Sequence, residues 1–192
     1  NLILKEKNQV ISSLSKSYKD SFSKKNIKHF NKKFDYRIIG MGGSTLGVQA
    51  IYSFLKKKIK KKFIFVDNLN AFKNKKTKKN LNNLIISKSG NTTETIVNAN
   101  ILVKKKDKNL FITEKKNSYL SSLAQKLKAE VVDHNNYIGG RYSVLSEVGM
   151  LPAELMGLNY KNFRQLNNLV KNKFFMKALI SNVEATIYFL KA

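Results

Sequence analysis

Short apolar runs alternate with longer amphipathic segments along most of the chain. Five runs, rich in β-branched and aromatic side chains, have the length and composition of buried strands. They lie at 36–39, 63–66, 84–86, 110–112 and 130–132. Segments with helical spacing lie between them, near 45–58, 69–80, 92–106 and 118–128. This alternation predicts an α/β fold, with a parallel five-stranded sheet and helices on both of its faces.

Helical patterns flank this unit on both sides. Residues 2–22 predict one N-terminal helix, and helical segments follow the last strand near 144–157, 161–171 and 174–191. The last segment is amphipathic and reaches the end of the sequence without a glycine cap or a polar tail. The sequence also begins with Asn rather than Met. We therefore expect the chain to be a fragment of a longer protein.

The composition narrows the classes of protein that the chain could belong to. Its 192 residues, of which 42% are hydrophobic, are enough for one domain with a sizeable core. The lack of cysteine excludes disulfides, thiolate zinc sites and cysteine nucleophiles, and two histidines leave little for a metal cluster. No apolar run approaches the roughly 20 residues that span a bilayer, and no signal peptide is recognisable. We expect a soluble, cytoplasmic protein.

The net charge is +25, from 37 basic and 12 acidic residues. Such an excess is typical of proteins that bind nucleic acid or an anionic membrane surface. Here the excess is lysine spread along the chain, and the densest run, 56–62, contains no aromatic or arginine side chain to stack on bases or read their edges. Lysines at a helix C-terminus also suit the helix dipole. A solvated helix end is favoured, and we expect no nucleic-acid or membrane partner.

A glycine-rich segment, GMGGSTLG at 40–47, follows the first predicted strand. Glycines let the chain turn sharply and let backbone N–H groups approach an oxyanion, and Ser44 is placed to open the next helix. The spacing is not that of a dinucleotide fingerprint, because Thr45 stands where the third glycine is required. Two interpretations stay open: an anion site that includes Gly43 and Ser44, or a tight strand-to-helix turn.

A hydroxyl-rich segment, SKSGNTTET at 87–95, follows the third predicted strand. It sets several hydroxyls and one ammonium at a helix N-terminus, where unpaired N–H groups already favour negative charge. The candidate ligands are Ser87, Lys88, Ser89 and Thr92. No glycine-lysine-hydroxyl triplet of a nucleotide P-loop is present. Helix capping needs only one or two hydroxyls, so the cluster favours a phosphate site over a mere cap.

Two segments offer candidate acids or bases. If Asn91 is the helix N-cap, Glu94 falls at the third helical position, where it completes a capping box instead of acting as a base. Asp133 and His134, at the end of the fifth strand, could form an acid-base pair. The sequence offers no third group to orient the histidine, so a short polar loop is the favoured interpretation.

The segment GGRYSVLS at 139–146 places an arginine directly after two glycines. Arginine offers a planar, always-charged fork that holds an anion in a fixed orientation, and the glycines indicate close backbone approach. Because the carboxyl ends of parallel strands meet at one edge of a sheet, Arg141 is expected near Ser44 and the Ser87 loop. There it could stabilise an enediolate, the anion formed when a proton leaves the carbon beside a carbonyl. The alternative is a structural salt bridge.

Together, IGMGGSTLG, ISKSGNTTET and GGRYSVLSEVG resemble the motifs of the glucose-6-phosphate isomerase family, within the sugar-isomerase (SIS) superfamily of Rossmann-like folds. They occur in the family's order across residues 35–150. The resemblance implies that Gly43 and Ser44 contact the sugar, that the four residues of the hydroxyl-rich segment bind the phosphate, and that Arg141 steadies the enediolate. This chain departs from many family members in having Gly90 where they carry a bulky residue and Val48 where they carry a proline.

The resemblance also implies what lies around these motifs. The expected activity is the interconversion of glucose 6-phosphate and fructose 6-phosphate in glycolysis and gluconeogenesis, with no metal or organic cofactor and as a homodimer at full length. The family's glutamate base, ring-opening histidine and late lysine follow the arginine motif and fall beyond Ala192, so this chain alone is expected to be nearly inactive. The implied domains are an N-terminal helical segment at 1–30, the SIS domain at 31–158, and a helical segment at 159–192 that leads into a second SIS domain.

Two other classes of function stay open at this point. One is a non-catalytic SIS module that binds a sugar phosphate, because the middle motif alone would match many such modules. A polybasic nucleic-acid binder is disfavoured, because it would not need the three motifs in this order.

Overall fold

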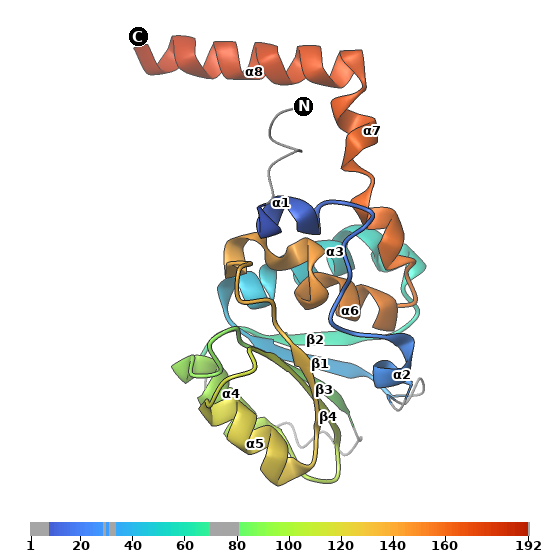
Figure 1. The fold of residues 1–192 in the computed structure, drawn as a ribbon, viewed down its shortest axis with the longest axis vertical. Coiled ribbons are helices and arrows are strands. Elements are labelled where there is room, and N and C mark those ends of the chain that lie inside the picture. Colours follow the sequence, from blue (N-terminus) through green and yellow to red (C-terminus); the bar gives the residue numbers. More distant parts are fainter. Residues whose placement is uncertain (1–7, 29, 31–33, 70–80, 192) are drawn as a thin grey trace.

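The computed structural model describes residues 8–28, 30, 34–69 and 81–191. Five parallel strands form one sheet in the order β2-β1-β3-β4-β5 (Figure 1). The strands are β1 Tyr36–Gly40, β2 Phe63–Val66, β3 Asn82–Ile86, β4 Lys108–Thr113 and β5 Glu130–Asp133. All five predicted strands and the parallel α/β fold are confirmed.

Two pairs of helices cover the sheet (Figure 1). The first pair is α3 Leu46–Leu55 and α6 Glu147–Leu155, and the second is α4 Thr93–Leu102 and α5 Tyr119–Leu127. Successive strand residues enter different cores, as the pleat of a strand requires. Ile38 packs in the core with α3 and α6, and Ile39 packs with α4 and α5. Both side chains are fully buried, so helices on both faces are confirmed.

The remaining helical elements are short, except for α8, which has 19 residues. They are α1 Gln9–Ser13, α2 Lys24–Ile27, α7 Leu166–Val170 and α8 Lys173–Lys191, with 3-10 turns η2 Gly42–Ser44, η3 Lys56–Lys58, η4 Gly140–Leu145 and η5 Tyr160–Arg164. The lysines of η3 are exposed beyond the end of α3, which confirms a solvated helix end. Lys61 differs from them, because its ammonium donates to the Leu155 carbonyl at 3.1 Å and lies over the Tyr36 ring.

The single helix predicted for 2–22 is wrong over its second half. α1 ends at Ser13, and the chain continues through turns to residue 22. Two serine hydroxyls, those of Ser12 and Ser13, donate to carbonyls three residues back, a local bond that competes with a continuing helix. Phe22 is drawn into the core instead. Residues 1–7, and nearly all of the helix predicted at 69–80, lie outside the described residues.

Arg164 ties the N-terminal segment to the body of the protein. Its side chain is 3% exposed and forms a two-pronged salt bridge with Asp20, which is 6% exposed. The same guanidinium donates to the carbonyls of Ser13 and Leu145 and lies 5.0 Å from the Tyr18 ring centroid. Because η5 ends at this residue, the helix predicted for 161–171 is divided into η5 and α7. The clamp joins α1, η4 and η5.

α8 extends away from the rest of the molecule (Figure 1). None of its residues is buried, and its apolar side chains include Phe174 at 87% and Leu190 at 80% exposure. Among the described residues, no helix is long and apolar enough to cross a membrane.

The Arg164 clamp gives a testable prediction about stability. Arg164→Ala leaves the Asp20 carboxylate buried without its cation, so we expect a loss of about 3 kcal/mol in the free energy of unfolding. The matched control is Arg141→Ala, whose side chain is exposed and which should change stability by less than about 0.5 kcal/mol. Urea denaturation followed by circular dichroism measures both. Equal losses in the two variants would contradict a clamp at Arg164.

Candidate functional site

The three sequence motifs follow strands β1, β3 and β5, whose carboxyl ends share one edge of the parallel sheet. Two of the motifs are in direct backbone contact. A Cβ placed on Gly43 would lie 2.2 Å from the Gly140 carbonyl oxygen and 3.0 Å from the Arg141 nitrogen. Only glycine fits there, because a side chain would overlap backbone that has nowhere to move. The motif after β1 therefore abuts the motif after β5.

Neighbouring contacts extend this junction. The Ser143 hydroxyl donates to the carbonyls of Gly43 and Gly140, and a Cβ on Gly47 would lie 2.6 Å from a Val144 methyl group. Glycines at 43 and 47 thus let the start of α3 and the η4 turn pack closely. The sequence predicts this packing only in general terms, as close backbone approach to an unspecified partner. The partner is the other glycine motif.

Ser44 lies in η2, two residues before the start of the helix that it is predicted to open. α3 begins at Leu46, and its N-cap residue is Thr45, whose hydroxyl donates back to the Gly42 carbonyl. Among the described residues, the half-buried Ser44 side chain makes no hydrogen bond. The helix-opening role is wrong because the 3-10 turn intervenes, and the hydroxyl is left available to a ligand.

The hydroxyl-rich loop after β3 is internally braced. The Ser87 and Thr92 hydroxyls lie 2.9 Å apart, and the Ser89 hydroxyl accepts a hydrogen bond from the Asn91 N–H. Gly90 has a φ of +69°, and a Cβ there would lie 2.2 Å from the Ser118 hydroxyl. In this chain, a larger residue at position 90 would displace the loop from the start of α5.

The predicted capping box at the start of α4 is wrong. The helix begins at Thr93 with Thr92 as N-cap, so Glu94 is its second residue rather than its third. The Asn91 side-chain oxygen instead accepts a hydrogen bond from the Tyr119 N–H at 2.9 Å. Asn91 is used to join two loops at the sheet edge, and this tertiary bond replaces the local cap.

Lys88 reaches from the hydroxyl-rich loop to the segment after β5. Its ammonium donates to the Asn136 carbonyl at 2.5 Å and lies 3.6 Å from a Glu114 carboxylate oxygen. Lys116 also pairs with Glu114. Burial raises the pKa of Glu114, but the two lysines outweigh it and hold that pKa below its usual value. Lys88 therefore links the second motif to the residues that lead into the third.

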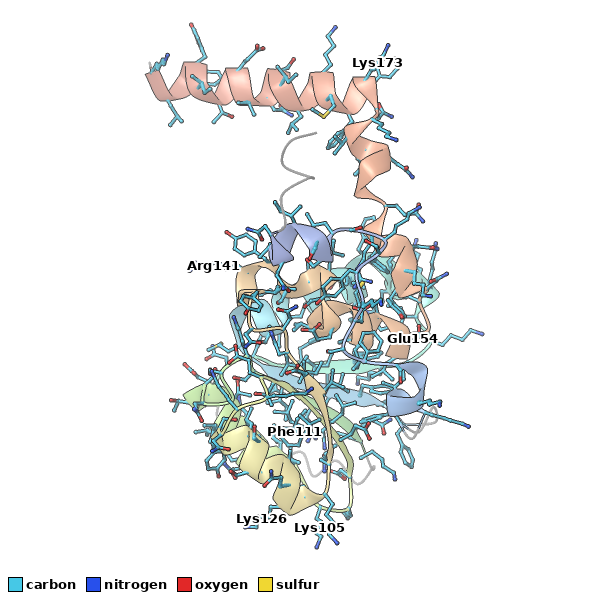
Figure 2. All side chains as sticks on the ribbon, in the orientation of Figure 1. Lys105, Phe111, Lys126, Arg141, Glu154 and Lys173 are labelled. Atoms are coloured by element: carbon cyan, nitrogen blue, oxygen red, sulfur yellow. The ribbon has the colours of Figure 1, made fainter. Side chains whose placement is uncertain are left out.

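Arg141 is an exposed residue of η4 (Figure 2). Its guanidinium makes no salt bridge or hydrogen bond with any other residue in the described ranges. The alternative of a structural salt bridge is therefore wrong for Arg141, and Arg164 has that role. A charged, planar donor group at the sheet edge is free to bind an anion.

His134 belongs to a buried cluster that the sequence did not reveal. The side chain is 1% exposed, and its Nδ1 lies 3.1 Å from the Asn135 carbonyl and 3.9 Å from a Glu147 carboxylate oxygen. Burial lowers the pKa of His134, although the Asn135 carbonyl and Glu147 act in the opposite direction. Asp133 binds the Lys115 backbone instead. Asp133 and His134 therefore do not pair with each other, and His134 is a buried residue beside the Asn135 carbonyl rather than part of a solvated polar loop.

A signal for Glu147 was present in the sequence. It is a lone acid in the apolar run VLSEVGMLP, at a position that faces the core once α6 forms.

Within the described part of the chain, no three His, Asp or Glu side chains are grouped as ligands for a metal ion. The site has hydroxyls, backbone N–H groups, an ammonium and a guanidinium, which are donors suited to a phosphorylated, oxygen-rich ligand.

The geometry of Gly90 predicts a specific loss. Gly90→Ala should lower the free energy of unfolding by about 2–3 kcal/mol, because it adds both a strained φ and a clash with Ser118. Gly157 is the matched control, since its φ is +83° but a Cβ there meets nothing within 4 Å. Gly157→Ala should cost only about 1 kcal/mol, the strain alone. Urea denaturation compares the two, and equal losses would show that the Ser118 contact is not restrictive.

The buried His134 predicts a pH dependence of stability. Because its pKa is lower in the folded protein, the unfolded chain binds the proton first as the pH falls below about 6.5. Stability should therefore be highest above pH 6.5 and fall as the pH drops toward the folded-state pKa. His134→Gln should flatten this slope between pH 7 and pH 5.5, measured by urea denaturation. Glu114 contributes its own loss in a more acidic range, so an unchanged slope near pH 6 would contradict the assignment to His134.

The chain has relatives among curated proteins. It is 32% identical to the glucose-6-phosphate isomerase of Methanocaldococcus jannaschii, over 98% of this chain and 50% of that protein. It is 33% identical to the enzyme of the same name from Mycoplasma genitalium, over 83% of this chain and 44% of that protein. The chain thus spans about half the length of the curated relatives it matches.

Solved structures share the fold. A hypothetical protein from Thermus thermophilus has a TM-score of 0.66 at 21% identity, over 83% of this chain and 44% of its own. Tagatose-6-phosphate ketose/aldose isomerase from Escherichia coli has a TM-score of 0.52 at 17% identity, over 73% of this chain and 42% of its own. The family model described as phosphoglucose isomerase matches residues 8–191. With this match across nearly its whole length, the chain belongs to the phosphoglucose isomerase family.

Proposed function

We propose that this chain supplies the sugar-phosphate site and the enediolate-stabilising arginine of an enzyme that interconverts glucose 6-phosphate and fructose 6-phosphate. The observation that carries the proposal is the contact between Gly43 and Gly140. It brings the Ser44 hydroxyl and the unpaired Arg141 guanidinium onto abutting backbone segments. The names of the curated relatives support the choice of substrate.

Each motif has a distinct part in the proposed reaction. Ser87, Ser89 and Thr92 bind the phosphate at the start of α4, where the helix N-terminus adds unpaired N–H groups. Lys88 adds a positive charge, and Gly43 and Ser44 contact the sugar. The phosphate provides binding energy remote from the reacting carbons, which fixes the sugar relative to Arg141.

The chemical step is a proton transfer between C2 and C1. Removal of the C2 proton from the open-chain aldose places negative charge on the C1 oxygen and forms an enediolate. A proton then moves from the C2 hydroxyl to the C1 oxygen, and return of the abstracted proton to C1 gives the ketose. A guanidinium held beside these oxygens stabilises the charge where it develops and so lowers the barrier. The proton-transferring base is not among the candidate residues of this chain.

The longer enzyme is part of the same proposal. The relatives are about twice the length of the aligned region, and we assign the base, the ring-opening group and the second SIS domain to the portion that this chain lacks. We propose the arrangement 1–30 helical segment, 31–158 SIS domain and 159–192 connecting helices. We also propose a cytoplasmic homodimer at full length.

Arg141 can be tested by binding, without turnover. A five-carbon aldonate 5-phosphate carries a planar carboxylate that resembles the enediolate in shape and charge. We expect Arg141→Lys to weaken its binding roughly 10- to 100-fold, because a two-pronged charged contact is lost, while fructose 6-phosphate loses less than about threefold. Calorimetry on the wild-type chain and the variant measures both. The substitution conserves charge, so a general electrostatic effect is controlled.

Other outcomes separate the alternatives. Tight fructose 6-phosphate binding with no preference for the aldonate, in both proteins, would favour a non-catalytic sugar-phosphate module. Equal losses for the two ligands would make Arg141 a substrate anchor. Binding that falls steeply with salt and is matched by inorganic phosphate would show only the attraction of a highly cationic surface.

A further inference from the structure

Glu147 lies within the third motif and is fully buried at the first position of α6, and the roles proposed for the motifs do not account for it. One carboxylate oxygen accepts a hydrogen bond from the Asn135 N–H at 2.8 Å, and the other accepts one from the Tyr18 hydroxyl at 3.3 Å. Burial, followed by the charge of Glu147, raises the pKa of Tyr18 to about 12, so this hydroxyl keeps its proton. Both carboxylate oxygens therefore have donors.

The environment of this carboxylate is unusual for a residue that only fills space. In the described ranges, no lysine or arginine forms a salt bridge with Glu147, and burial favours the neutral form of its neighbour His134. A buried charge without a cationic partner is costly and is held only by well-placed hydrogen bonds. An apolar residue at the start of α6 would avoid that cost. The carboxylate is therefore there for the groups that it binds, the Asn135 N–H and the Tyr18 hydroxyl.

The bonds of Glu147 lead directly to Lys88. Glu147 holds the Asn135 N–H, and the carbonyl of the next residue, Asn136, accepts the Lys88 ammonium. The same strand end continues through the buried Ile138 to the turn that carries Arg141. Glu147 thus fixes a short segment with a lysine of the hydroxyl-rich loop at one end and the arginine turn at the other.

The N-terminal segment also helps to hold Asn135 in place. The Asn135 side chain donates to the Gln9 side-chain oxygen at 3.1 Å and to the Tyr18 hydroxyl at 3.4 Å. Asn135 is therefore held through both its backbone and its side chain. A chain of contacts therefore connects the N-terminal segment, through Glu147 and Asn135, to the segment that links Lys88 and Arg141.

We infer that Glu147 is a positioning residue, which fixes Asn135 and Asn136 so that Lys88 and Arg141 are held at the spacing that a sugar phosphate requires. The inference rests on the proposed function of the site. Glu147 acts through the loop and has no contact with the ligand. The shape of the Asn135–Arg141 segment is the property that it controls.

The test compares Glu147→Ala with Glu147→Gln in this chain. Glutamine keeps an oxygen that can accept the Asn135 N–H, whereas alanine removes the acceptor. We expect Glu147→Ala to speed amide hydrogen exchange at 135–141 and at 88–92, and to weaken aldonate phosphate binding about tenfold. Glu147→Gln should retain most of both properties. Circular dichroism confirms that each variant is folded before either measurement.

Glu154→Gln is the matched control, because Glu154 lies at the other end of α6. Figure 2 shows it on the opposite side of the body from Arg141. This variant should change neither exchange in the two segments nor ligand affinity. It separates a general weakening of α6 from a specific effect on the loop.

Two results would overturn the inference. Unchanged exchange at 88–92 in Glu147→Ala would show that the anchor does not reach Lys88, whether or not any ligand binds. Faster exchange with unchanged affinity would reduce Glu147 to a stabilising role. A wild-type chain that binds no sugar phosphate would instead remove the proposed function, and the exchange data alone would then decide whether Glu147 holds the two segments.

Discussion

The contact between the Gly43 and Gly140 backbones is the constraint on which the site depends. Two loops that are almost one hundred residues apart in sequence approach until position 43 has no room for a Cβ. A hydrogen bond or salt bridge between side chains would tolerate an ångström of drift, but backbone packed on backbone does not. Ser44 and Arg141 are next to these glycines, so this packing sets the spacing of their backbones.

The three arginines show how one residue type serves different ends in a lysine-rich chain. Arg37 is buried and donates to the Leu102 carbonyl at the amino-terminal side of the sheet. Arg164 is buried in a salt bridge with Asp20. Arg141 alone is exposed, with its guanidinium unpaired among the described residues. The guanidinium groups of Arg37 and Arg164 bind groups of the protein itself, whereas that of Arg141 is placed where it could bind an external anion.

The sequence predicted those features that local pattern controls. The five strands were recoverable because each contains a short run of β-branched or other apolar residues, and their order made the three motifs meet at one edge. The predictions that were wrong share one physical cause, which is contacts between residues far apart in the sequence. Asn91 bonds Tyr119 instead of capping α4, and Glu147 faces His134 across two elements. No local rule contains such pairs. The serines of α1 were visible, but the Arg164 clamp that redirects the chain after them was not.

α8 is stabilised by different interactions from those that stabilise the sheet and its covering helices. Its 19 residues bury no side chain, so the helix relies on its own hydrogen bonds and propensities rather than on a core. Helices of that kind form and melt gradually, near the length at which they are marginal in water. The sheet, by contrast, melts as a cooperative unit. Heating this chain should therefore produce a slow early decline in helical signal, unrelated to the integrity of the sheet and of the loops at its carboxyl edge.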